Sequence, residues 1–302
     1  MTPQRKKLGL FNYRFKAMGT VCSMQCYASS EEAGRKVSEL VHADVSRLEQ
    51  LYSRYLPESL LSNINRTAAQ GGEIRLDEET AGLFNYAATC YENSDGLFDV
   101  TSGVLRRAWR FDQAQVPAQE TIDALLLTVG WQKLVWEAPL LRFPVPGLEI
   151  DLGGVVKEYA ADRAAVICQD AGIRHGFINL GGDIRIVGPH PDGSPWHAGI
   201  EHPRIKGEVL ANLELFNGAL ACSGDYERCM VINGERYSHI INPFTGWPAK
   251  HMASVSVVAD FCLVAGSAST IAMLKEADGP AWLEELGLPH LWMDVHGKTG
   301  SM

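Results

Sequence analysis

The spacing of apolar positions predicts both helices and strands along this chain. Between Ser30 and Tyr55, apolar side chains return every three or four positions, the period of a helix that buries one face. Ser29 or Ser30 can cap the start of this helix, and Pro57 ends it. Residues 20–28 alternate between small and apolar side chains instead, which predicts a strand. The apolar positions of the helix are Ala33, Val37, Leu40, Val41, Val45, Leu48, Leu51 and Tyr52.

The same patterns predict the remaining elements. We expect further helices at residues 78–91, 120–128, 155–171, 265–275 and 281–286. Strands are expected at residues 148–152, 176–180, 184–187, 196–201, 209–216, 218–221, 254–259 and 291–295. Because strands and helices are mixed without strict alternation, the fold class is α+β, with a mixed sheet, rather than a doubly wound sheet. No repeat or linker divides the chain, so we expect a basic tail over residues 1–14 and a single domain over residues 15–302.

A tight hairpin is predicted near residue 233. Asn233-Gly234 separates residues 229–232 from residues 236–241, and Asn-Gly tolerates the two positive φ angles of a two-residue turn. The hairpin would present His239 on a strand. Just before it, residues 222–228 gather a thiol, hydroxyls, carboxylates and a guanidinium around one glycine.

Composition and charge exclude several classes of protein. The chain has 302 residues, 46% of them hydrophobic, and a formal net charge of −9, so nucleic acid is not expected as a partner. The longest apolar run, residues 261–274, is too short to span a bilayer, so no membrane insertion is expected. The seven cysteines include no C-x-x-C pair, so we expect free thiols, and a zinc site has little support. Free thiols in turn predict residence in the cytoplasm.

Glycine-rich turns beside single carboxylates are the remaining chemical signal. The sequence has no G-x-G-x-x-G, P-loop, H-E-x-x-H or G-x-S-x-G motif. A strand, Gly153-Gly154 and a helix that carries Lys157 in its first turn form an arrangement that favours anions. Taken singly, residues such as Asp151, Asp183, Lys157 and His239 more often have structural roles than catalytic or ligand-binding ones.

The order of six segments resembles the ApbE family of FAD:protein FMN transferases, formerly described as thiamine biosynthesis lipoproteins. The resemblance extends from about residue 15 to about residue 275. The segments are Met18-Gly-Thr, Ser53-Arg-Tyr, Asp95-Gly-Leu-Phe-Asp-Val-Thr, Asp151-Leu-Gly-Gly-Val-Val-Lys, Asn179-Leu-Gly-Gly-Asp, and Ser223-Gly-Asp-Tyr-Glu-Arg with Tyr237-Ser-His-Ile-Ile-Asn-Pro-Phe-Thr-Gly.

The resemblance implies that FAD lies in a cleft between a T-fold-related α+β core and a smaller subdomain. It also implies a magnesium ion held by Gly154, Ser269 and Thr270. The positions that match FAD contacts in the family are Met18, Tyr55, Leu97, Phe98, Asp99, Asp151, Lys157, His239 and Ile240.

The implied reaction is a phosphoryl transfer. A threonine hydroxyl of a target flavoprotein attacks the FMN phosphorus of FAD, AMP leaves, and FMN stays bonded to the acceptor. This chemistry needs charge neutralisation at a pyrophosphate, which a divalent cation and Lys157 would supply. Either His239 or Asp225 could take the proton from the threonine, and the sequence leaves both open.

One departure from the family lies at the predicted metal site. The family usually carries A-D-A-x-x-T near its C-terminal helix, whereas residues 265–270 here are AGSAST, with Gly266 in place of the aspartate. Magnesium normally takes one or two carboxylates. The FAD phosphates could supply the ligands, or Asp260 or Asp225 could substitute. Two other functions also stay open: a non-catalytic FAD-binding homologue serving as carrier, sensor or accessory factor, and an FAD pyrophosphatase that yields FMN and AMP.

Overall fold

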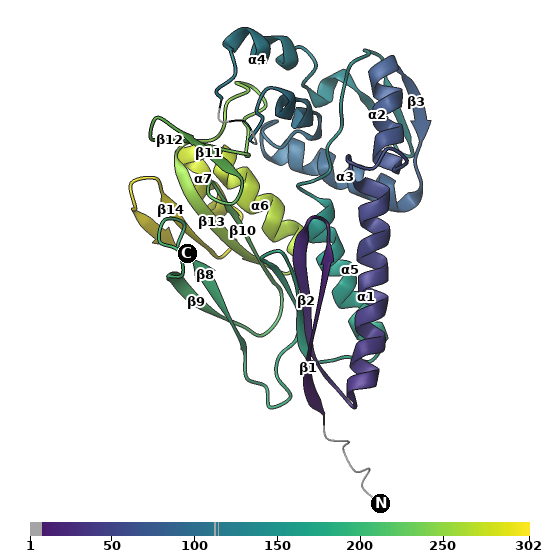
Figure 1. The fold of residues 1–302 in the computed structure, drawn as a ribbon, viewed down its shortest axis with the longest axis vertical. Coiled ribbons are helices and arrows are strands. Elements are labelled where there is room, and N and C mark those ends of the chain that lie inside the picture. Colours follow the sequence, from purple (N-terminus) through teal and green to yellow (C-terminus); the bar gives the residue numbers. More distant parts are fainter. Residues whose placement is uncertain (1–7, 112, 114) are drawn as a thin grey trace, which may run out of the picture.

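An eight-stranded antiparallel sheet forms the centre of the computed structural model, which describes residues 8–111, 113 and 115–302 (Figure 1). The strand order is β1-β2-β6-β7-β10-β13-β14-β15, and each neighbouring pair is antiparallel. The strands are β1 (Gly9–Ala17), β2 (Thr20–Ala28), β6 (Gly176–Leu180), β7 (Asp183–Gly188), β10 (Ala219–Gly224), β13 (Met252–Ala259), β14 (His290–Asp294) and β15 (Thr299–Ser301).

Three neighbouring helices pack on this sheet. Helix α1 (Glu31–Tyr52) contacts β1 and β2, α5 (Val156–Asp170) contacts β6 and β7, and α6 (Cys262–Leu274) contacts β10 and β13. The short helices η3 (Glu276–Asp278) and α7 (Gly279–Glu285) follow α6. Helix α5 touches both α1 and α6, so its buried residues, such as Ala160 and Ala164, complete the core between the helices and the sheet.

A smaller subdomain is formed by the chain between α1 and α5, and it lies at the top of Figure 1. Its sheet has the order β3-β5-β4. The elements are α2 (Leu60–Gln70), β3 (Gly72–Arg75), α3 (Glu78–Asn93), η1 (Val100–Arg107), α4 (Gln119–Leu126), η2 (Trp131–Lys133), β4 (Val135–Glu137) and β5 (Leu140–Phe143). The predicted α+β class with a smaller subdomain is confirmed, but the core sheet is antiparallel throughout rather than mixed.

Two hairpins lie outside the main sheet. One joins β8 (Trp196–Glu201) to β9 (Val209–Leu215), and the other joins β11 (Cys229–Ile232) to β12 (Glu235–Ser238). Asn233 and Gly234 have φ angles of 52° and 84°, so the predicted turn is confirmed. His239 lies one residue beyond β12, not within it, because the next amide, that of Ile240, donates to the Ser238 hydroxyl instead of a strand partner.

The N-terminal prediction needs correction. Residues 9–14, which we assigned to the basic tail, belong to β1 and pair with β2 from Gly9↔Ala28 onward. Half-buried Phe11, Tyr13 and Phe15 alternate with exposed polar or basic neighbours. This alternation is the period of a strand, and the charges of the exposed face obscured it.

The predicted strand at residues 148–152 is also wrong. The segment is not a strand, because a side chain supplies the hydrogen bonds that a neighbouring strand would give. The Asn65 amide donates to the Ile150 carbonyl (2.9 Å) and accepts from the Ile150 N–H (2.7 Å). Asn65 lies on α2, a helix that the sequence analysis missed.

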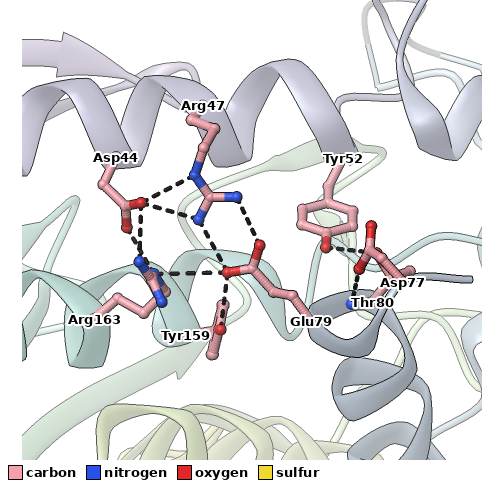
Figure 2. A network of polar contacts seen from close by, with 8 residues as sticks. All are labelled: Asp44, Arg47, Tyr52, Asp77, Glu79, Thr80, Tyr159 and Arg163. Carbon is pink, nitrogen blue, oxygen red and sulfur yellow. Dashed lines mark hydrogen bonds and ion pairs between the residues drawn. The ribbon is translucent and has the colours of Figure 1, made fainter.

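A network of charged side chains ties α1, α3 and α5 together (Figure 2). Arg47 of α1 donates to Glu79 of α3 (2.6 and 2.9 Å) and to Asp44, while Arg163 of α5 donates to Asp44 (2.7 and 3.0 Å). Tyr159 of α5 donates to Glu79. These contacts fix the subdomain, through α3, against the two core helices. Within the described residues, no helix is long and apolar enough to cross a membrane.

Candidate functional site

The Met18-Gly19-Thr20 segment lies against the glycine turn that precedes Asp183. Met18 and Gly19, with φ angles of 52° and 72°, form the turn between β1 and β2. A Cβ at Gly181 would lie 2.6 Å from the Thr20 hydroxyl oxygen, so only glycine fits this approach. Two of the six segments are therefore in direct contact at the start of β7.

Lys157 and Asp183 form an ion pair at the first turn of α5. The Lys157 ammonium lies 2.6 Å from Asp183 Oδ2, and Asp183 is only 3% exposed. Burial opposes the charge on Lys157, but the neighbouring carboxylates of Asp183 and Glu158 outweigh it and raise the lysine pKa. Lys157 is therefore a fixed positive charge at this position.

The junction before α5 is held together by Asp151. Its Oδ1 accepts from the Gly153 N–H (2.9 Å), and its Oδ2 forms an ion pair with Arg54. The N–H groups of Val155 and Val156 both donate to the Leu152 carbonyl. These amides are therefore satisfied within the protein, so the positive charge at the junction comes from Lys157 and Arg54 more than from the helix N-terminus.

Tyr55 presents an accessible ring next to this junction. The residue is 75% exposed, and its hydroxyl accepts from Arg54 Nη2 at 2.9 Å. This hydrogen bond from a guanidinium lowers the tyrosine pKa. The ring is thus positioned by Arg54 and free to stack on a planar group.

The segment that contains Leu97, Phe98 and Asp99 connects the subdomain to the site in two ways. Leu97 packs against the buried cluster that includes Ile240. Phe98 is buried beside the glycine turn, since a Cβ at Gly154 would lie 3.3 Å from its ring.

Asp99 has a structural environment. Its Oδ1 accepts from the N–H and the hydroxyl of Thr101 (2.8 and 2.7 Å), and its Oδ2 accepts from the Trp131 N–H (2.9 Å). Burial raises its pKa, against the effect of these hydrogen bonds. Both carboxylate oxygens thus stabilise the start of η1 and the turn at Trp131.

His239 is exposed to water but closely surrounded by protein. Desolvation, together with the positive charge of Arg228, lowers its pKa from 6.5 to about 4. Lys157 adds to this effect, so the imidazole and the ammonium lie within electrostatic range of each other. The ring is neutral at physiological pH, the state that can accept a proton.

The carboxylate of Asp225 is paired with Arg204. Arg204 binds both of its carboxylate oxygens, at 2.7 Å each, and the Asp225 residue is 5% exposed. This bidentate pair anchors the loop before β11 to the loop before β9. Of the two candidate bases, His239 is therefore the one whose neutral ring can accept a proton. The paired carboxylate of Asp225 is also unsuited to replace a metal ligand.

Three hydroxyl groups join β10 to α6. The Ser223 hydroxyl lies 2.8 Å from that of Ser269 and 3.1 Å from that of Thr270. Ser269 also donates to the Gly266 carbonyl at 3.0 Å. The structure therefore brings Ser269 and Thr270 together with Ser223, whereas Gly154 lies beside Phe98.

A residue that the sequence analysis missed lies beside Gly266 of α6. Glu158 of α5 is 7% exposed, and its Oε2 has no hydrogen-bond partner in the described structure. Burial, followed by the charge of Asp183, raises its pKa to about 7. A Cβ at Gly266 would overlap Glu158 Cγ and lie 3.0 Å from Cδ. No motif marks this residue, because its partner is a glycine 108 positions away on another helix.

The described residues contain no cluster of three or more His, Cys, Asp or Glu side chains with the geometry of a metal site. A divalent cation here would need hydroxyl, carbonyl, water or phosphate oxygens beside any carboxylate. The unpartnered Glu158 oxygen and the oxygens of Ser223, Ser269 and Thr270 are of the type that magnesium prefers.

Two surface depressions lie elsewhere, along the outer side of α1. One, of about 630 Å³, is lined by α1 and α5 residues such as Ala43 and Ile167. The other, of about 570 Å³, is lined by the charged network of Figure 2, including Arg47 and Glu79. None of the predicted site residues lines either, so these depressions are distinct from the site built around Lys157.

Comparisons with known proteins identify the family of the chain. The family model described as "ApbE family" matches residues 18–292. The FAD:protein FMN transferase of Vibrio cholerae is 30% identical over 272 residues, which cover 86% of this chain and 81% of that protein. The FAD:protein FMN transferase of Escherichia coli K12 is 29% identical, with coverage of 86% and 76%.

Solved structures give the same result. The ApbE protein from Thermotoga maritima superposes with a TM-score of 0.89 at 30% identity, covering 97% of both chains. The apo flavinyl transferase ApbE of Pseudomonas stutzeri has a TM-score of 0.87 at 27% identity, covering 98% of this chain and 95% of that one. The shared segments, the fold and the family match over most of the sequence lead to one conclusion: this chain belongs to the ApbE family.

Proposed function

We propose that this protein transfers the FMN part of FAD to a threonine hydroxyl of a flavoprotein acceptor and releases AMP. The observation that carries the proposal is the convergence of a fixed cation, Lys157, and a neutral imidazole, His239, among the six segments. The names of the family relatives support the same reaction.

Each residue has a role that follows from its surroundings. Lys157 neutralises charge on the pyrophosphate of the substrate, because its ammonium is held in place by Asp183. The Tyr55 ring and the Met18 turn offer apolar surface to the planar rings of FAD. Asp151 acts through Arg54 and through the Gly153 amide, so it shapes the phosphate end of the site without touching the reacting atoms.

The chemical step exchanges the phosphoanhydride bond of FAD for a phosphodiester bond. The acceptor threonine oxygen forms a bond to the FMN phosphorus, and the bond between that phosphorus and the bridging oxygen of AMP breaks. His239 takes the threonine proton, and AMP leaves as a phosphate anion beside Lys157. A bound divalent cation, which we expect to be magnesium, would stabilise negative charge on the phosphate oxygens.

The test is an incubation of the purified protein with FAD and magnesium, with and without a threonine-bearing acceptor domain. A mass gain equal to FMN on the acceptor, together with AMP, is the expected result, and an acceptor with the threonine replaced by alanine should gain nothing. FMN and AMP without an acceptor would indicate a pyrophosphatase. FAD that stays bound and intact would indicate a carrier or sensor, and either outcome would refute the transfer.

We also propose that the reaction takes place in the cytoplasm. The cysteines, from Cys22 to Cys262, are free thiols, and most are buried. Free thiols suit a reducing compartment. Fractionation of the native cells, with an antibody against this chain, tests the location.

A further inference from the structure

Side chains at positions 158 and 266 would fill the same volume between α5 and α6. The Glu158 side chain crosses from α5 to the backbone of α6 at Gly266. A Cβ added at Gly266 would overlap Glu158 Cγ and lie 3.0 Å from Cδ and 3.1 Å from Oε1. Any side chain at position 266 would therefore have to occupy the volume that the Glu158 carboxyl now fills.

The carboxyl group in this volume is only partly compensated by the protein. Glu158 is 7% exposed and its Oε2 has no partner in the described structure. The nearby ammonium of Lys157 is already bonded to the buried carboxylate of Asp183. Two buried carboxylates thus share one cation, and an uncompensated buried charge is costly. The missing partner must be a cation or a proton.

Position 266 is where the family usually carries its aspartate, as the A-D-A-x-x-T pattern indicates. In this chain a glycine at 266 and a glutamate at 158 leave the carboxylate in the same place but attach it to the neighbouring helix. We propose that Glu158 is the anionic ligand of the divalent cation in this protein, in place of an aspartate at position 266. This inference rests on the proposed function for the identity of the cation, but not for its location.

The geometry favours this exchange over a simple loss of the site. A glutamate without a ligand role would be costly to bury so completely, whereas glutamine or leucine would fill the same volume without charge. The α6 side of the volume also carries suitable oxygens. Ser269 bonds to the Gly266 carbonyl, and Ser223 bonds to both Ser269 and Thr270. These hydroxyls are neutral, so the charge must come from Glu158.

The test measures cation binding without FAD or acceptor. Mn²⁺ replaces Mg²⁺ as the probe, and electron paramagnetic resonance of free Mn²⁺ gives the affinity. We expect Glu158→Gln to weaken binding by roughly tenfold or more, because it removes the charge and keeps the shape. The matched control is Glu227→Gln, which removes a carboxylate that also acts on Lys157 but is exposed. It should leave the affinity within about twofold.

A second pair of variants tests the shared volume. Gly266→Asp alone should overlap with Glu158 and lower the melting temperature. The double variant Glu158→Ala/Gly266→Asp should fold normally and bind Mn²⁺ again, because the carboxylate returns to the same place from α6. Without metal, Glu158→Gln should melt at least as high as the parent protein, and adding Mn²⁺ should raise the melting temperature of the parent but not that of Glu158→Gln.

These results separate the inference from the proposed function. Equal Mn²⁺ binding by the parent and Glu158→Gln, or no binding by the parent, would overturn the role of Glu158; in the second case the carboxyl carries a proton. A double variant that folds but does not bind would also count against it. If Mn²⁺ binding follows Glu158 but no FMN reaches any acceptor, the metal ligand stands and the transferase proposal fails.

Discussion

The Lys157 ammonium lies 2.6 Å from Asp183 Oδ2, so the first turn of α5 is bonded to the first residue of β7. Asp183 is 3% exposed and lies directly after the Gly181-Gly182 turn. The position of the lysine therefore depends on a carboxylate that is itself buried. Variants of this ion pair can therefore distinguish an effect on the stability of the protein from an effect on its activity.

Replacing Lys157 with methionine should remove both activity and stability. Asp183 would remain buried without a partner, which costs roughly 3 kcal/mol of unfolding free energy. In the double variant Lys157→Met/Asp183→Asn the stability should return, whereas FMN transfer should stay lost. Urea unfolding and the acceptor mass assay measure the two quantities. Recovery of transfer in the double variant would show that Lys157 has no role in the chemistry.

His239 should titrate far below an ordinary histidine. Desolvation and Arg228 lower its pKa to about 4, so the ring is neutral from pH 8 down to about pH 5. Since the unfolded histidine binds a proton near pH 6.5 and the folded one does not, His239 should make folding less favourable as the pH falls from about 6.5 to 4. A ring-proton NMR titration of His239 with a midpoint near 6.5 would contradict this.

The same residue should dominate the chemical step. We expect His239→Gln to lower kcat for FMN transfer by roughly 10² to 10⁴, the range for a lost general base, with little change in FAD affinity. Stopped-flow mixing with an acceptor that does not yet carry FMN measures kcat, and quenching of FAD fluorescence measures FAD binding. A loss confined to FAD binding would assign His239 to the substrate contacts instead.

Asp225 should act on stability only. Its bidentate pair with Arg204 is mostly buried, so Asp225→Asn should cost on the order of 3 kcal/mol. The double variant Arg204→Met/Asp225→Leu should recover much of this loss, and its folded fraction should keep kcat within a few-fold of the parent. A kcat that falls a hundredfold in the folded double variant would return Asp225 to the list of candidate bases.

The charged network of Figure 2 should make the protein sensitive to acid. Burial disfavours the charge of Asp44, but hydrogen bonds from Arg163 and Arg47 outweigh it and lower the pKa; the bond from Arg47 lowers that of Glu79. A carboxylate whose pKa is lowered on folding stabilises the protein at pH values above its unfolded pKa of about 4. This stabilisation disappears as the pH falls through the lower pKa of the folded state. Melting curves from pH 7 to 3 should show a shallower decline for Asp44→Asn. Equal slopes would contradict the assignment.

Local signals in the sequence predicted much of the fold. The Asn233-Gly234 turn, α1 and the Gly181-Gly182 turn each depend on residues that are close in sequence, so their patterns were sufficient. Helix α2 carried such a signal too, with Ser59 as its cap and buried Leu61, Ile64 and Ala68 at helical spacing. The strand predicted at residues 148–152 was wrong because the hydrogen bonds of this segment come from Asn65, which no local pattern reveals.

The candidate site was predicted less completely than the fold. The family resemblance identified Lys157 and His239, and the structure brings them within electrostatic range of each other. It could not reveal that Asp225 is held by Arg204 or that Asp99 supports η1, since both contacts join separate parts of the chain. Glu158 was missed because its surroundings become visible only when α5 lies beside Gly266 of α6.

Helix α5 is fastened on one side by the network of Figure 2 and carries Lys157 and Glu158 on the other. Tyr159, two residues after Lys157, is bonded to Glu79 of the subdomain. An opening of the subdomain away from the core would break these bonds and would pull on the helix that carries Lys157 and Glu158. The position of the subdomain and the position of these two charged side chains are therefore mechanically linked through α5.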